Sequence, residues 1–112
     1  MAKDKKKSKS LPRHRIAVIA GDGIGNEVVP EGQRVLEAAG RRFGFELKWD
    51  EKPWSCEYYK KHGAMMPKDG LDQIRNHEAI YLGAVGFPGV PDHVSLWGLL
   101  IPIRREFQLY VN

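Results

Sequence analysis

The sequence predicts an α/β layered fold with a largely parallel sheet, and two observations support this fold class. Short, nearly continuous apolar runs at residues 15–20 and 79–85 are typical of strands that are buried on both faces of a parallel sheet. Segments with helical spacing of apolar residues, such as 26–43, lie between these strands. This alternation of strands and helices favours parallel strands joined by helical crossovers.

A glycine-rich loop, Gly21–Gly25, follows the first strand and leads into the helix at 26–43. We expect Asn26 to cap the helix N-terminus, because an Asn side chain accepts hydrogen bonds from free backbone N–H groups there. We expect Gly44 to end the helix, because glycine readily adopts the left-handed conformation of a C-terminal cap. Five apolar residues lie near one face of this helix: Val28, Val35, Leu36, Ala39 and Phe43.

The remaining elements follow in order: a half-exposed strand at 45–51, short helices at 55–62 and 67–76, a strand at 79–85, a loop at 86–95 and a helix at 97–110. The last helix contains Pro102. A proline in the middle of a helix costs about 3 kcal/mol, because it lacks an N–H group and its ring crowds a carbonyl one turn earlier. We therefore expect this helix to begin near Pro102 or to kink there.

The composition excludes several classes of protein. A chain of 112 residues has the length of one domain. Its only cysteine, Cys56, cannot form an internal disulfide, which favours a reducing compartment, and we expect a cytoplasmic protein. No apolar run approaches the roughly 20 residues that span a membrane, and the N-terminus lacks the apolar segment of a secretory signal. We expect no membrane partner.

The positive net charge belongs to one end of the chain. Residues 1–15 hold seven of the 18 Lys and Arg residues and one of the 14 acids, so they carry +6 and the remainder carries −2. We interpret residues 1–14 as a disordered basic tail, because they offer almost nothing apolar to bury. Residues 15–112 form the folded part. The tail is either a solubilising extension or a targeting or nucleic-acid-binding segment, whereas the acidic body favours no nucleic-acid partner.

The glycine loop does not match the known nucleotide-binding patterns. The dinucleotide fingerprint requires G-x-G-x-x-G, but Asn26 occupies the third glycine position and Gly25 comes one residue early. No Gly-Lys-Ser/Thr follows, so the loop is not a P-loop either. Asp50 lies where a ribose-binding acid would lie, and with the fingerprint broken we interpret it as a surface acid. The loop is either a tight strand-to-helix turn or a ligand-facing loop.

Four stretches, in order, resemble the β-decarboxylating dehydrogenases, a family that includes the isopropylmalate, isocitrate, tartrate and D-malate dehydrogenases. These stretches are RIAVIAGDGIG followed by NEV at 15–28, AIYLGAVGFP at 79–88, WGLLIPIRR at 97–105 and EFQLYVN at 106–112. The resemblance covers residues 15–112. Within the family, WSCEYY at 54–59 and PDHVSLWG at 91–98 look most like the tartrate/D-malate dehydrogenase branch.

The resemblance implies a fold, an activity and partners. The fold would be part of an isopropylmalate dehydrogenase-like layered sheet, which is not a Rossmann fold and agrees with the broken fingerprint. The activity would be NAD-dependent oxidation and decarboxylation of a small 2-hydroxy dicarboxylate such as D-malate or tartrate, assisted by Mn²⁺ or Mg²⁺. Members of the family form homodimers. Isopropylmalate dehydrogenase is the alternative within this fold.

The family pattern also implies that the chain is a truncated, N-terminal part of such an enzyme. By that pattern, Leu-Arg-Pro would follow Asn112, and the metal-binding aspartates and the catalytic Tyr and Lys would come later still. We therefore expect no catalytic residue and no metal ligand within this chain, and no turnover by the chain as it stands. A non-catalytic module that binds a nucleotide or a protein partner is the alternative from a different functional class.

The resemblance assigns substrate and cofactor contacts to a few residues. Arg104 corresponds to the first substrate arginine, and a guanidinium fork matches a carboxylate bidentately. Leu99 and Leu100 would line the pocket for the variable part of the substrate, with ordinary helix packing as the alternative. Where Leu96 stands, isopropylmalate enzymes carry an acid, so a bulky leucine suggests a small substrate. The expected cofactor contacts are Ile24, Phe87, Pro88 and Leu96.

Overall fold

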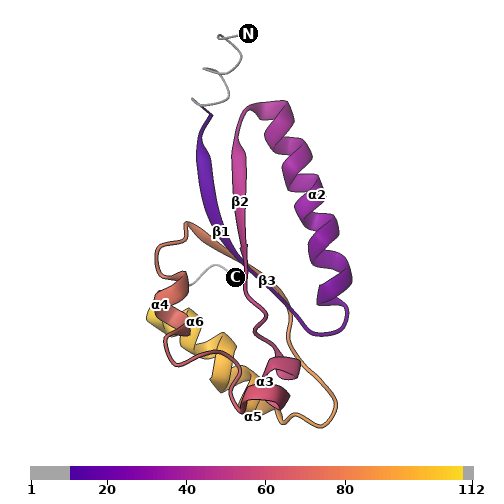
Figure 1. Ribbon diagram of the computed structural model, residues 1–112, viewed down its shortest axis with the longest axis vertical. Coiled ribbons are helices and arrows are strands. Elements are labelled where there is room, and N and C mark those ends of the chain that lie inside the picture. The colour runs from indigo at the N-terminus through magenta and orange to yellow at the C-terminus, as the bar shows by residue number, and fades with distance from the viewer. Residues whose placement is uncertain (1–10, 110–112) are drawn as a thin grey trace.

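The computed structural model describes residues 11–109, and a three-stranded parallel sheet lies at its centre (Figure 1). The strands are β1 (Arg13–Gly21), β2 (Glu46–Glu51) and β3 (Ala79–Ala84), in the order β2-β1-β3. In this register Ala17 of β1 lies opposite Asp50 of β2 and Ile80 of β3. The predicted α/β class and parallel sheet are confirmed.

The central position of β1 explains its continuous apolar sequence. Ala17, Val18 and Ile19 are completely buried, because both faces of this strand are covered and both edges are paired. The strand begins at Arg13 rather than at Arg15. Arg13 and His14, which we assigned to the disordered tail, therefore belong to the sheet, and residues 1–10 of that tail lie outside the described residues.

Helix α2 (Gly25–Phe43) packs against one face of the sheet through its smallest residues (Figure 1). Gly25, Val29 and Gly40 are buried. A Cβ atom on Gly32 would collide with the Tyr81 hydroxyl of β3, and one on Gly25 would collide with the Ala20 carbonyl of β1. Gly25 therefore lets the start of the helix lie directly against strand backbone, and Gly32 leaves room for the Tyr81 side chain between the helix and β3.

The apolar face that we identified on this helix is not the face that packs. Val28, Val35, Leu36 and Phe43 keep between 40% and 74% of their surface exposed. Asn26 is not the N-cap either. Ile24 occupies that position without a side-chain cap, and Asn26 Nδ2 donates to the Gly21 carbonyl at 3.5 Å. The predicted end at Gly44 is confirmed, since its φ of 83° is left-handed and its N–H donates to the Gly40 carbonyl.

The other helices pack against the opposite face of β1. They are α3 (Cys56–His62), α4 (Gly70–Ile74), α5 (Asp92–Ser95), a π-helical turn η1 (Leu96–Leu100) and α6 (Ile101–Glu106). The buried side chains of these helices and of the loops beside them form one apolar cluster with Ala17 and Ile19: Trp54, Cys56, Met65, Ile74, Val90, Leu99 and Ile103. The helix expected at 67–76 is shorter than predicted, and α5 lies within the segment expected to be a loop.

Pro102 is accommodated by the π-helical turn that precedes it. The Ile101 N–H donates to the Leu96 carbonyl, five residues back rather than four. The wider turn moves the carbonyl that the proline ring would otherwise meet, so the helical path continues from Asp92 to Glu106. The helix predicted to reach Tyr110 ends at Glu106, and Tyr110 itself lies outside the described residues. None of the helices between residues 11 and 109 is long and apolar enough to span a membrane.

Candidate functional site

The loops that follow β1 and β3 leave the same edge of the sheet. The chain passes from β1 through α2 to β2 on one side of β1, whereas β3 lies on the other side. In open α/β sheets, ligands bind outside the carboxyl ends of the strands, at the point where the connections from neighbouring strands lead to opposite sides. The loops at 21–25 and 85–91 border this point. Three of the four cofactor contacts expected from the resemblance lie in these loops, namely Ile24, Phe87 and Pro88, whereas Leu96 lies on η1.

Asp22 joins these two loops, and sequence reasoning missed it. Its N–H donates to the carbonyl of Ala84 at 2.6 Å, and its Oδ2 accepts from the Gly86 N–H at 3.2 Å. Gly21 allows this approach because its φ is 82° and a Cβ there would collide with the Ala84 carbonyl oxygen. The carboxylate is buried, with 5% of the residue exposed.

The same carboxylate also holds the start of α3. Asp22 Oδ2 accepts a hydrogen bond from the Cys56 N–H at 3.0 Å, and Oδ1 accepts one from the Glu57 N–H at 3.4 Å. Ser55 completes the cap by accepting from the Tyr58 N–H at 3.1 Å. Burial, together with the hydrogen bond and charge of Asp22, raises the pKa of the Cys56 thiol to about 11. Cys56 is therefore a buried, protonated thiol.

The expected cofactor contacts are all exposed side chains. Ile24 is 58% exposed, and Phe87 and Leu96 keep about 40% of their surface exposed, while Pro88 is also exposed. The Lys60 ammonium of α3 lies 3.7 Å from the centre of the Phe87 ring, which holds a positive charge over that ring. Exposed apolar side chains next to a cation suit a flat, anionic ligand.

The start of α2 offers no cradle for a phosphate. The N–H groups of its first turn are already bonded to carbonyls at residues 22–24: Gly25 to Asp22, Asn26 to Gly23, and Glu27 and Val28 to Ile24. A diphosphate bound in the manner of the Rossmann fingerprint would need those groups free. The backbone of residues 21–25 is therefore a tight strand-to-helix turn, and only the Ile24 side chain is presented outward.

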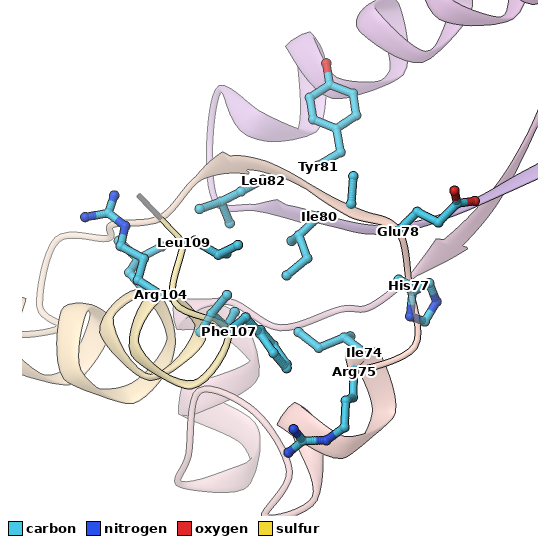
Figure 2. Close-up of a pocket in the computed structure, with 13 residues that line it drawn as sticks. Ile74, Arg75, His77, Glu78, Ile80, Tyr81, Leu82, Arg104, Phe107 and Leu109 are labelled. Atoms are coloured by element: carbon cyan, nitrogen blue, oxygen red, sulfur yellow. The ribbon is translucent and has the colours of Figure 1, made fainter. Parts of the chain in front are cut away.

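A second feature is a cavity of about 520 Å³ between β3 and α6 (Figure 2). Ile80 and Leu82 point into it from β3, and Phe107 and Leu109 line the opposite side, whereas Tyr81 points away toward α2. Leu100 also lines the cavity, but Leu99 is completely buried in the core and does not. For Leu99, packing is therefore the role that the structure supports.

Arg104 lies at the rim of this cavity, with its guanidinium directed away from Arg75 (Figure 2). Within residues 11–109, no side-chain hydrogen bond or ion pair engages Arg104. By contrast, Arg75 bonds Asp72 at 3.2 Å and Glu106 at 3.0 Å. Arg104 is thus an exposed cation with no side-chain partner between residues 11 and 109, and its guanidinium has the geometry to bind a carboxylate. The expected cofactor contacts do not line this cavity, so the structure does not bring both groups into one pocket.

The part of the chain that the structure describes contains no group of three or more His, Cys, Asp or Glu side chains that could hold a metal ion. The His77 and Asp50 side chains do meet, with Nε2 and Oδ2 2.9 Å apart, but they form only a pair. The residues at 11–109 therefore do not fit the divalent cation that the resemblance implies.

The described part of the chain is thus a three-stranded parallel α/β sheet, with two loops at its carboxyl edge and Arg104 at the rim of a neighbouring cavity. The chain belongs to the isocitrate/isopropylmalate dehydrogenase family, whose model matches residues 15–112. This confirms the resemblance on which the expected contacts were based.

The relatives place the chain within this family. It is 60% identical over 100 residues to D-malate dehydrogenase [decarboxylating] of Escherichia coli (strain K12), covering 88% of this chain and 28% of the relative. It is 57% identical over 106 residues to tartrate dehydrogenase/decarboxylase of Pseudomonas putida, covering 91% of this chain and 29% of the relative. The crystal structure of a β-decarboxylating dehydrogenase from Thermococcus kodakarensis matches with a TM-score of 0.67 at 31% identity, covering 87% of this chain and 27% of that one. The chain therefore spans less than a third of the length of these relatives.

Proposed function

We propose that this chain supplies the N-terminal part of an NAD-dependent dehydrogenase that oxidises and decarboxylates a small 2-hydroxy dicarboxylate, D-malate or tartrate. The observation that carries the proposal is the 60% identity to a D-malate dehydrogenase over 100 residues. At this level of identity, the loops and helix described above have direct counterparts in a protein named for that activity.

In this proposal the loops at 21–25 and 85–91 contact NAD. The exposed side chains of Ile24 and Phe87 offer apolar surface for its flat rings, and Lys60 places a cation next to that surface. Bound NAD would accept the hydride removed from the substrate carbon. The bonded N–H groups of the first turn of α2 mean that its phosphates would be held elsewhere.

Arg104 binds a substrate carboxylate in this proposal. Its guanidinium is exposed at the cavity rim and has no acidic partner among residues 11–109. A fixed bidentate clamp restricts how a hydroxy acid lies, and so determines which hydrogen faces the cofactor. Leu100 would limit the room beside this carboxylate, which favours a small substrate. Leu96, exposed on η1, is assigned to the cofactor side.

We also propose that the assembled enzyme requires Mn²⁺ or Mg²⁺ and is a homodimer. The described residues hold no suitable group of metal ligands, so the proposal assigns the metal to no residue among 11–109. Residues of a family-length protein outside this segment would supply the ligands.

A segment exchange tests the proposal. Residues 15–109 of this chain replace the matching segment of the E. coli D-malate dehydrogenase, and the hybrid is assayed with NAD on D-malate, tartrate and 3-isopropylmalate. We expect turnover of D-malate or tartrate with NAD, because the segment carries the contacts assigned above. The unmodified E. coli enzyme, purified in parallel, is the control.

Two results of this exchange would contradict the proposal. A folded hybrid that preferred 3-isopropylmalate would favour the other branch of the family. A folded hybrid with no turnover on any of the three substrates would mean that this segment cannot serve in a dehydrogenase of this kind. Circular dichroism and thermal unfolding separate these outcomes from simple misfolding.

A further inference from the structure

The buried carboxylate of Asp22 has no positively charged partner among residues 11–109. It is instead satisfied by backbone N–H groups of Cys56, Glu57 and Gly86, at 3.0, 3.4 and 3.2 Å. A buried charge without such donors would strongly destabilise the fold. Three segments therefore have to stay in place for the carboxylate to remain satisfied: the loop that carries Asp22, the start of α3 and the chain at Gly86.

Two of these segments border the proposed cofactor surface. Asp22 lies two residues before Ile24, and Gly86 lies one residue before Phe87. The backbone bond from Asp22 to Ala84 fixes the last residue of β3, and the side-chain bond to Gly86 fixes the chain two residues further on. Together they determine both the distance between the two loops and the direction in which the second loop leaves the sheet.

We propose that Asp22 is a positioning residue for the cofactor: its carboxylate holds the 86–91 loop against the 21–25 loop, so that Phe87 and Ile24 are prearranged for one dinucleotide. This inference rests on the proposed function. Asp22 does not itself contact the ligand, because its oxygens are occupied and the residue is buried.

We expect the Asp22 carboxylate to raise the fraction of molecules in which the 86–91 loop is arranged for binding. When a binding-competent arrangement is only partly populated, the apparent affinity falls by that fraction. Without the carboxylate, the Gly86 N–H loses its acceptor, and the path of the exposed residues 86–89 then depends on the Val90–Phe87 backbone bond and the contact of Lys60 with Phe87. Binding of NAD should therefore weaken without the loss of any residue that contacts it.

The experiment compares three variants of the 112-residue chain. Asp22→Ala removes the acceptor from Gly86. Asp22→Asn is the conservative variant, since its single amide oxygen can occupy the position of Oδ2 and keep the bonds to Cys56 and Gly86. Ser55→Ala is the matched control, because it removes the other cap of α3 while leaving the bond between Asp22 and Gly86 in place.

Two measurements are made on each variant: NAD affinity by calorimetry, and hydrogen exchange of the Gly86 amide by NMR. We expect Asp22→Ala to weaken NAD binding about tenfold or more and to lose protection at Gly86. Asp22→Asn and Ser55→Ala should stay within about threefold of the parent and keep that protection. Unfolding in urea, measured alongside, separates loss of stability from loss of affinity.

The proposal is overturned if Ser55→Ala weakens NAD binding as much as Asp22→Ala does, because stability alone would then explain the effect. It is also overturned if the Gly86 amide of the parent chain exchanges as fast as an unprotected loop amide, a result that does not depend on any variant folding. If the parent binds no NAD but protects Gly86, the cofactor role of the loops fails, while the contact between Asp22 and Gly86 stands.

Discussion

The Nε2 atom of His77 lies 2.9 Å from Oδ2 of Asp50, and only 1% of the His77 side chain is exposed while 37% of the Asp50 side chain is. The pair crosses the central strand, since Asp50 belongs to β2 and His77 precedes β3. The other ring nitrogen of His77 is buried and has no partner among the described residues. Asp50 is thus the polar contact that keeps this imidazole in the interior.

The first prediction concerns the acid stability of this pair. Burial alone would raise the pKa of Asp50, but the hydrogen bond from His77 and the nearby charge of Lys52 lower it below its ordinary value. Because the pKa of Asp50 is lower in the folded chain than in the unfolded chain, where it is about 3.9, its ionised form stabilises the fold at pH values above about 3.9. This stabilisation is lost as the pH falls through the folded-state pKa. We therefore expect Asp50→Asn to be less stable than the parent at pH 6, with the difference shrinking toward pH 3.

Urea unfolding at the two pH values checks this expectation. Glu37→Gln, on the exposed side of α2, changes the net charge equally and should show no such convergence. A stability difference between Asp50→Asn and the parent that is the same at pH 3 and pH 6 would contradict the role given to Asp50.

The second prediction uses Cys56 as a reporter. With burial and Asp22 raising its pKa to about 11, the thiol should be almost entirely protonated at pH 8. Only about 0.1% would then be thiolate, against about a quarter for an unperturbed thiol. We expect iodoacetamide to label native Cys56 at least about 100-fold more slowly than the urea-unfolded chain. Asp22→Asn should speed the native reaction, because it removes a negative charge beside the sulfur.

Mass spectrometry of alkylated chains over time gives both rates, with urea-unfolded protein as the internal reference. Labelling of the native parent at the rate of a free thiol would show that Cys56 is neither buried nor held protonated as described.

The third prediction tests the close approach of α2 to β3. Gly32→Ala places a methyl group against the Tyr81 hydroxyl. Overpacking costs about 1–3 kcal/mol, whereas exchanging Gly for Ala in a helix gains up to about 1 kcal/mol. We expect a net loss of about 1 kcal/mol in the free energy of unfolding, measured in urea.

Tyr81→Phe supplies the matched background, because it removes only the hydroxyl that the new methyl group meets. In that background Gly32→Ala should be neutral or stabilising. Equal destabilisation by Gly32→Ala in both backgrounds would show that the hydroxyl is not what limits the approach.

The fourth prediction concerns Arg104 in the hybrid enzyme. Losing a charged partner of a bound carboxylate costs about 2–5 kcal/mol, so Arg104→Ala should lower kcat/KM for D-malate about 30-fold or more. Arg104→Lys should recover only part of this, because an ammonium cannot form the bidentate fork. The KM for NAD should stay within about twofold.

The neighbouring Arg105 provides the control, since it has the same chemistry one residue further along α6 and does not line the cavity. Arg105→Ala should change kcat/KM less than about threefold. If the two alanine variants are equally impaired, or Arg105→Ala is the worse, the substrate role assigned to Arg104 is wrong.

Much of the fold could be predicted because burial on both faces leaves a continuous apolar sequence, as in Ala17–Ile19, and because Gly44 marks a helix end. The side of α2 that packs against the sheet could not be predicted from the positions of its apolar residues. Its contact side consists largely of glycines, which add nothing to a hydrophobic pattern but make room for backbone at Gly25 and Gly40 and for the Tyr81 side chain at Gly32. Val35 and Phe43 therefore gave a misleading signal, and the spacing of Gly25, Gly32 and Gly40 was the informative one.

The candidate site was predictable only in part. Resemblance directed attention to Arg104 and Phe87, whose neighbours in sequence carry recognisable motifs. The contacts of Asp22 with Gly86 and of Asp50 with His77 join residues 64 and 27 positions apart. Such contacts depend on the strand order β2-β1-β3, and no local pattern encodes that order. For Asp22 the only available signal was an acid between two glycines.

The π-helical turn η1 has a consequence for how chains of this family can differ in length. Such a turn holds one residue more than an α-helical turn, so it can lose that residue without rotating the helix that follows. Elsewhere in the helix, a deletion would turn every later side chain by about 100° around the axis. We therefore expect alignments of related chains to show single-residue gaps at 96–100, because a deletion there leaves the direction of the Arg104 side chain unchanged. We expect no such gaps between Ile101 and Arg104.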